Sequence, residues 1–80
     1  MPPLTQIAHE AAQYNGHYGW KGYSNMLNRI AEIVIANNLS REEAIQAIKQ
    51  GLSNSGALLN DTYCTNMAVL GWENIQKRIK

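Results

Sequence analysis

The chain has 80 residues, a mass of 8.9 kDa and a formal net charge of +1, which allow one domain with a thin hydrophobic core. Hydrophobic residues make up 45% of the sequence and charged residues 16%, the reverse of a disordered composition. The near-neutral charge argues against an acidic DNA mimic and against a dedicated binder of duplex DNA, which is usually strongly basic.

A single cysteine, Cys64, excludes a disulfide within the chain and a multi-cysteine zinc site. The sequence has no apolar run long enough to span a membrane. Its first residues, MPPLT, lack the basic start and apolar stretch of a signal peptide. We therefore expect a soluble protein of a reducing compartment, the cytoplasm.

The first expected helix covers residues 3–14. A proline suits its first turn, and Asn15-Gly16 supplies a stop because both residues tolerate a positive φ. Residues 15–23, NGHYGWKGY, are expected to form a loop, which contains three glycines and three aromatic residues. The apolar residues at helical spacing in the first helix are Leu4, Ile7, Ala8, Ala11 and Tyr14.

The second helix is expected to begin after Ser24, a favourable N-cap residue. It should end at Asn37-Asn38, with Leu39 folding back onto it. The helical period continues through EIVIA, so this short apolar run is interpreted as helix rather than strand. The broad apolar face of this helix contains Met26, Leu27, Ile30, Ala31, Ile33 and Val34.

The third helix has the clearest start in the chain. Ser40 and Glu43 match a capping box, in which each side chain satisfies the backbone N–H of the other residue. The helix is expected to run from Arg41 to about Gln50 and to end at Gly51. Its inward-facing residues are expected to be Ala44, Ile45, Ala47 and Ile48.

A connection follows over residues 52–60, with a short helical turn expected around residues 57–59. Asp61 or Thr62 is expected to cap the last helix, which reaches about Ile79. Gly71 lies in its middle, at a cost of about 1 kcal/mol relative to alanine. We therefore expect the helix to kink or break there, or to admit another backbone. The apolar residues of this helix are Tyr63, Met67, Ala68, Leu70, Trp72, Ile75 and Ile79.

Strand signals are poor, because valine occurs twice and phenylalanine never. We predict a single all-α domain over residues 1–80, a compact irregular bundle of four to five short helices. The apolar faces of the second, third and last helices are expected to hold it together.

Catalytic and metal-binding patterns are weak. Cys64 and the two histidines, His9 and His17, lack the spacing of a metal site, and a free cysteine on an amphipathic helix is usually a core residue. The adjacent Glu42 and Glu43 are explained by the capping box and the helix dipole. The sequence therefore predicts a protein that is not an enzyme and that needs no cofactor or metal.

The segment of residues 15–23 is the main candidate for a binding surface. The aromatic rings of Tyr18, Trp20 and Tyr23 suit stacking on bases or anchoring in a protein interface. His17 and Lys21 add polar and cationic groups beside them. The alternative for Trp20 and Tyr23 is that their rings cover a small core that lacks phenylalanine.

Two further basic or glycine-rich features carry weaker signals. The glycines of GxxGxxG at residues 16–22 precede a helix, where anions are favoured, but their spacing matches no nucleotide-binding fingerprint. Lys77, Arg78 and Lys80 are candidates for contacts with phosphate or an acidic surface. Their alternative is a solvated helix end, where cations are favoured by the helix dipole.

Two segments carry a resemblance to a known family: residues 22–31, read as GYSNxLxRxA, and residues 38–44, read as NLSxEEA. Together they resemble the helical module at the C-terminal side of phage and plasmid primases, over residues 22–52. The resemblance implies a helical accessory piece that works beside nucleic acid, and it carries over no catalytic residue.

The sequence thus leaves two functions open. The first is a non-enzymatic binding protein from a phage or another mobile element that docks on a host protein, for example an inhibitor of host defence such as an anti-CRISPR protein. This hypothesis rests on size and on the absence of an active-site pattern, which is analogy. The second is an accessory module of replication that binds nucleic acid or a nucleotide through residues 15–23. A homodimer is compatible with either.

Overall fold

The computed structural model describes residues 2–13, 19–54 and 60–79, with the backbone alone for residues 19–21. The described residues form four helices and no strand, which confirms the predicted all-α class. The helices are α1 (Pro3–Gln13), α2 (Gly19–Asn37), α3 (Arg41–Ser53) and α4 (Asp61–Ile79). The described helices therefore number four rather than four to five, and the turn expected at residues 57–59 lies outside the described ranges.

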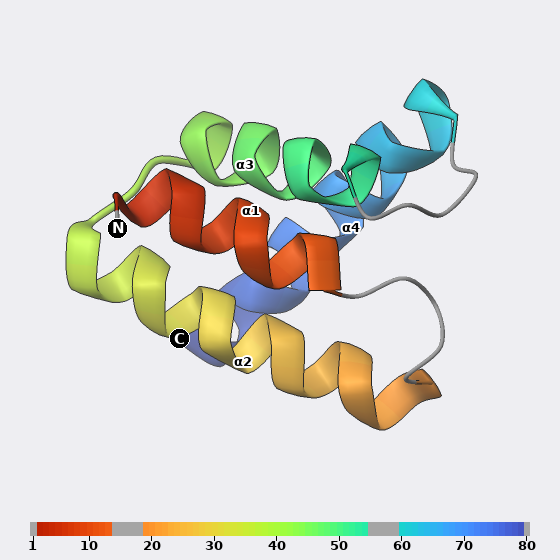
Figure 1. The fold of residues 1–80 in the computed structure, drawn as a ribbon. Helices are drawn as coiled ribbons and strands as arrows, with labels where there is room; N and C mark the ends of the chain where they lie inside the picture. The colour runs from red at the N-terminus through yellow and green to blue at the C-terminus, as the bar shows by residue number, and fades with distance from the viewer. Residues whose placement is uncertain (1, 14–18, 55–59, 80) are drawn as a thin grey trace.

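The four helices pack into one bundle of 31 × 23 × 22 Å (Figure 1). In the view of Figure 1, α1 lies between α3 and α2, and α4 runs behind them. The closest packing is that of α1 on α3, while α4 packs on both α3 and α2. None of these four helices is long and apolar enough to cross a lipid bilayer.

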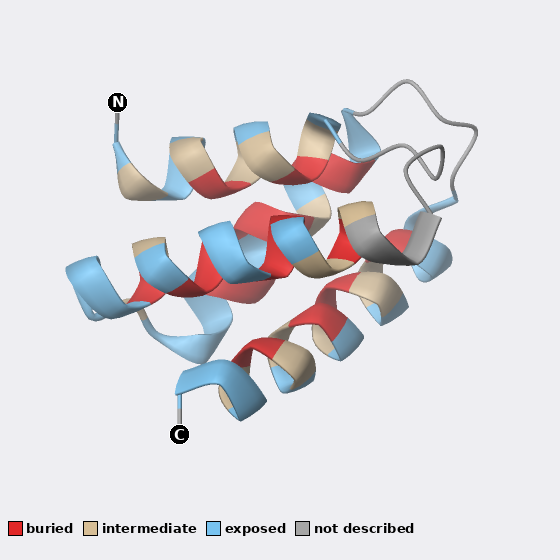
Figure 2. Cartoon of the chain, turned by 90° about the horizontal axis from the view of Figure 1, so that it is seen from below, coloured by how far each residue is buried: buried red, intermediate tan, exposed pale blue. Residues whose placement is uncertain are grey.

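Every helix contributes buried residues to a single core (Figure 2). The predicted inner face of α3 is confirmed, and Cys64 is a core residue with 1% of its surface exposed. Ile7 and Ala11 of α1 are fully buried as well. The expectation that the second, third and last helices hold the bundle together was therefore incomplete, because α1 closes the core from the side of α3.

The corner between α2 and α3 follows the sequence prediction closely. Asn38 has a positive φ of 49°, and the N–H of Leu39 donates to the carbonyl of Val34 at 3.1 Å, as in a Schellman motif. Ser40 then caps α3: its Oγ accepts from the N–H of Glu43, and Glu43 Oε1 accepts from the N–H of Ser40. One helix thus ends and the next begins within three residues.

The start of α2 differs from the prediction. The helix begins at Gly19 rather than after Ser24, so residues 19–23 of the expected loop are helical. Tyr23 explains the extension, because its side chain is only 8% exposed and joins the core. Burial of a large ring stabilises the turn that carries it, which offsets the poor helix propensity of Gly19 and Gly22.

The end of α3 also differs. The helix passes through Gly51 and ends at Ser53, where the N–H of Asn54 donates to the carbonyls of Gln50 and Gly51. A Cβ at position 51 would collide with the Ala8 carbonyl oxygen and would lie 2.6 Å from Ala11 Cβ. Gly51 is therefore present because α1 crosses α3 there at close range, and it does not end the helix.

Gly71 has a different environment, and α4 runs through it without a break. A Cβ at position 71 would meet side-chain atoms only, the nearest being Leu27 Cδ2 at 3.7 Å and Tyr23 Oη at 3.8 Å. These are ordinary contact distances, so no other backbone approaches this glycine. The helix therefore does not break at Gly71, and no second backbone approaches it, two of the outcomes that the sequence had suggested.

The inner face of α4 contains only some of the apolar residues that its sequence suggested. Buried residues recur at helical spacing as Cys64, Ala68, Gly71 and Ile75. Tyr63 and Leu70 are about half exposed, at 47% and 49%, because the small residues allow α4 to approach the bundle and leave no room for large side chains. The N-cap is Asn60, whose Oδ1 accepts from the N–H of Tyr63 at 2.7 Å, one residue before the caps that were expected.

Candidate binding surfaces

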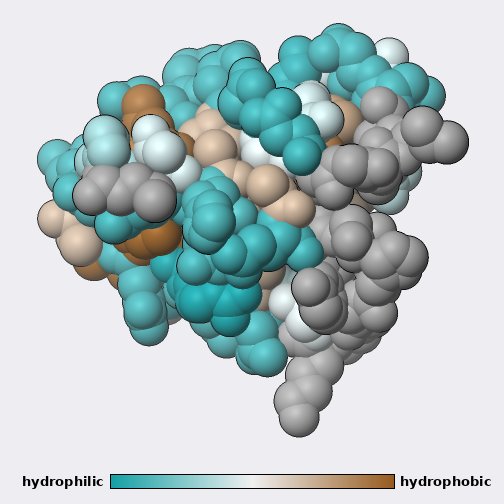
Figure 3. Space-filling view, viewed as in Figure 1, coloured by the Kyte–Doolittle hydropathy of each residue, from teal (hydrophilic) through white to brown (hydrophobic). Residues whose placement is uncertain are grey.

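An open groove of about 670 Å³ lies between α1 and α3. It exists because both helices present small side chains to it, Ala8 on α1 and Ala47 on α3, while Leu4 borders it with 38% of its surface exposed. In Figure 3 apolar surface, shown in tan, lies between the hydrophilic surfaces of the two helices. The described residues that line it are Leu4, Thr5, Ala8, Glu42, Glu43, Gln46, Ala47, Gln50 and Asn54.

The polar rim of this groove is acidic and amide-rich. No lysine or arginine is among the lining residues, and α1 contains neither residue type. Glu42 is paired with Arg41 at 2.8 Å on the surface, and Glu43 takes part in the capping box. The described lining offers a phosphate group two carboxylates, one of them neutralised by Arg41, and no lysine or arginine, so it does not form an anion site.

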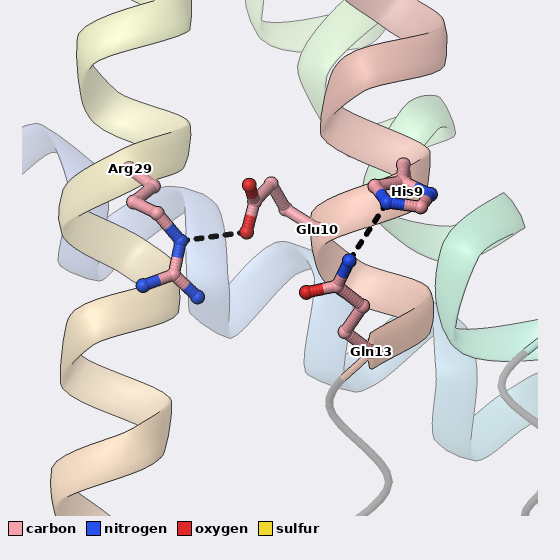
Figure 4. A network of polar contacts seen from close by, with 4 residues as sticks. All are labelled: His9, Glu10, Gln13 and Arg29. Carbon is pink, nitrogen blue, oxygen red and sulfur yellow. Dashed lines mark hydrogen bonds and ion pairs between the residues drawn. The ribbon is translucent and has the colours of Figure 1, made fainter.

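A second hollow, of about 390 Å³, lies between α1 and α2 and is polar. Arg29 Nε and Glu10 Oε2 form an ion pair at 2.6 Å across the two helices (Figure 4). His9 Nε2 lies 2.7 Å from Gln13 Nε2 on the same turn of α1. The charges of the pair neutralise each other, so this cluster links α1 to α2 and presents no single-sign surface to a ligand. Its lining residues are Gln6, His9, Glu10, Arg29, Glu32 and Ile33.

The predicted site in residues 15–23 is only partly described. His17 and Tyr18 lie outside the described residues, as does Lys80 of the C-terminal basic group, and the backbone alone is described for Trp20 and Lys21. Tyr23 belongs to the core. Its burial, with 8% of its surface exposed, favours the alternative that this ring covers the core over a stacking role.

Arg78 has a defined structural role. Its Nε donates to Asn28 Oδ1 at 2.6 Å, one terminal nitrogen donates to Ser24 Oγ at 3.1 Å, and the other donates to the Asn74 carbonyl at 3.0 Å. These bonds connect the end of α4 to α2. A contact with phosphate would compete with them, whereas the neighbouring Lys77 is exposed.

Of the cysteine and histidines considered for catalysis, the two that the structure describes, Cys64 and His9, do not lie together, and His17 is outside the described residues. Cys64 is buried in the core while His9 is on the surface. Among the described residues, no three histidine, cysteine, aspartate or glutamate side chains lie close enough together to hold a metal ion. A thiolate nucleophile needs both access and an activating partner, and the position of Cys64 provides no access.

Comparisons with protein-family models, with curated proteins and with solved structures give no match. The resemblance of residues 22–52 to a primase module stays a prediction. The α1–α3 groove was missed in the sequence because it is built by two helices about 40 residues apart in the chain. Its sequence signal is modest: Leu4 and Ala8 lie one turn apart on a helix that has no basic residue.

Proposed function

We propose that this chain is a non-enzymatic binding module that docks on another protein through the groove between α1 and α3. The observation that carries the proposal is the combination of an apolar floor, from Leu4, Ala8 and Ala47, with a rim whose described residues include no lysine or arginine. Protein interfaces have such apolar centres and polar rims. Nucleic-acid surfaces need basic residues instead, and Arg78 is engaged with Ser24 and Asn28.

The narrower hypothesis, an inhibitor of host defence such as an anti-CRISPR protein, stays a prediction on the sequence grounds given above. A docking protein of this size would act by occupying a surface that its target needs. The groove is compatible with that mode of action, since it requires no catalytic residue.

The test is affinity capture from a native lysate with two matched variants, in nuclease-treated and untreated arms. Gln46→Arg places a long cation at the rim of the groove from an exposed position, and Asn66→Arg makes the same change on an exposed position of α4. We expect a protein captured by the wild type and by Asn66→Arg, lost in Gln46→Arg, and insensitive to nuclease. Capture that requires nucleic acid, or that is unaffected by Gln46→Arg, contradicts the proposal.

A further inference from the structure

The shape of the α1–α3 groove indicates what kind of segment fits into it. Its α3 wall is formed by Glu43, Ala47, Gln50 and Asn54, which recur every three or four residues and so follow one side of the helix. Eleven residues separate the first from the last, which corresponds to about 16 Å of helix. The groove is therefore elongated along α3, and it is open to solvent on its outer side (Figure 3).

An elongated hollow between two neighbouring helices suits a third helix, because side-chain ridges of a helix pack into the space between two others. The small floor residues Ala8 and Ala47 allow such a helix to approach closely. A helix-in-groove mode uses apolar anchors at positions i, i+3 or i+4, and i+7. Three turns of the occupant would cover the length of the α3 wall.

Charge selects among helices. Glu42 and Glu43 both lie in the first turn of α3, so the two carboxylates border the same end of the groove. Glu42 forms an ion pair with Arg41, none of the ion pairs between described residues involves Glu43, and the Glu42 side chain remains 74% exposed. The Arg41–Glu42 pair is neutral overall, so the Glu43 carboxylate leaves an excess negative charge at this end, which favours a lysine or arginine on the occupant over an acidic residue.

The geometry points to an amphipathic helix of the partner protein, with small apolar anchors and a lysine or arginine at the end beside Glu42 and Glu43, as the occupant of the α1–α3 groove. This inference rests on the proposed docking function and specifies the partner's chemistry. The proposed occupant belongs to a different protein. The experiments below also show whether a second copy of this chain occupies the groove instead.

The test uses the full chain and two labelled helical peptides of about 16 residues, a length at which helices begin to be stable in water. One has leucine and alanine at i, i+3 and i+7 on the docking face and two lysines at the end of that face that would lie beside Glu42 and Glu43, and the matched peptide replaces each lysine by glutamate. Fluorescence anisotropy at low salt measures affinity, and amide chemical shifts locate the bound peptide. We expect the lysine peptide to bind at least about tenfold tighter and to shift amides of α1 and α3.

The double variant Glu42→Gln, Glu43→Gln separates charge from fold. Glutamine at the third helical position preserves a capping box, so helix α3 keeps its start. We expect about fivefold weaker binding of the lysine peptide and a smaller dependence on salt. Glu73→Gln, an exposed carboxylate on α4, is the matched control and should bind as the wild type does.

An apolar pair of variants tests the floor. Leu4→Ala removes an apolar group from the groove, whereas Ile35→Ala removes one that is 58% exposed at the end of α2. We expect weaker binding for the first variant and unchanged binding for the second. Equal affinity for the two peptides, no binding of either, or shifts confined to α2 and α4 overturns the inference.

Sedimentation equilibrium of the chain alone tests whether a second copy of the chain occupies the groove. A dimer that dissociates in Gln46→Arg would identify a second copy as the occupant and overturn the assignment to a different protein. If the peptides fail while lysate capture still depends on Gln46, the docking function stands and the helix assignment alone is wrong. If capture does not depend on Gln46, the docking function and the helix assignment are both wrong.

Discussion

The α1–α3 and α2–α4 helix pairs illustrate two ways of bringing helices together. Where α1 crosses α3, the backbone of α1 lies against Gly51, with the Ala8 carbonyl oxygen and Ala11 Cβ filling the space that a side chain would need. Where α4 faces α2, the side chains of Leu27 and Tyr23 surround Gly71 at ordinary distances. Both glycines are buried within a helix, yet only the first is required by its neighbours. The same residue type therefore has two different effects on stability.

The largest effect is expected for Gly51→Ala. The added methyl group would overlap a carbonyl oxygen of the α1 backbone, which cannot rotate away as a side chain can, so α1 must shift. Overpacking of this kind typically costs about 1–3 kcal/mol, and we expect a loss near the upper end, about 2–3 kcal/mol, after the small gain in helix propensity. Urea unfolding followed by circular dichroism measures it. Unfolding at the wild-type midpoint would contradict the close crossing of α1 and α3.

A smaller effect is expected for Arg78→Ala, which removes the polar connection on the outer edge of the α2–α4 pair. The bonds to Asn28 and Ser24 join these two helices, and we expect a loss of about 1 kcal/mol in the free energy of unfolding. Lys77→Ala is the matched control, because it deletes a neighbouring exposed cation. Equal stability of the two variants in urea melts would show that the Arg78 bonds contribute nothing measurable.

The smallest effect, of opposite sign, is expected for Gly71→Ala. A Cβ fits at this position, and alanine restricts the unfolded chain more than glycine does, so the free energy of unfolding should rise by about 0.4–1 kcal/mol. The change is chemically identical to Gly51→Ala, and each variant serves as the control for the other. A melting midpoint below that of the wild type would show that α4 needs the glycine.

Local signals in the sequence predicted local structure well. The capping box at Ser40 and Glu43, the positive φ of Asn38 and the end of α2 follow from interactions within a few residues. The inner face of α3 followed from its period of apolar residues. These features depend on neighbours in the chain, so the sequence alone contains the information.

The errors arise from contacts between distant segments. The sequence suggested that Gly51 ends a helix, whereas the structure shows that Gly51 makes room for Ala8. Similarly, Gly19 was expected in a loop, but burial of Tyr23 extends α2 to include it. The apolar residues of α4 predicted its inner face in part: Ala68 and Ile75 are buried, whereas Leu70 is about half exposed and close packing places Gly71 inside.

The candidate site was harder to predict for the same reason. Aromatic composition drew attention to residues 15–23, although Tyr23 belongs to the core. The α1–α3 groove is a hollow between two helices, and it forms because small side chains line it. Ala8 and Ala47 have no distinctive sequence signal, and only their meeting in the fold makes them a surface.

The three residues between α2 and α3 have a consequence for protein engineering. Asn38 turns the chain, the Leu39 N–H closes the end of α2, and Ser40 starts α3. Surface loops usually tolerate inserted tags and labels, because lengthening a flexible loop changes its closure entropy little. Each residue of this corner takes part in ending α2 or starting α3. An insertion there would therefore separate two helix caps and change the angle between the helices. Fusion partners and fluorescent labels therefore belong away from residues 38–40.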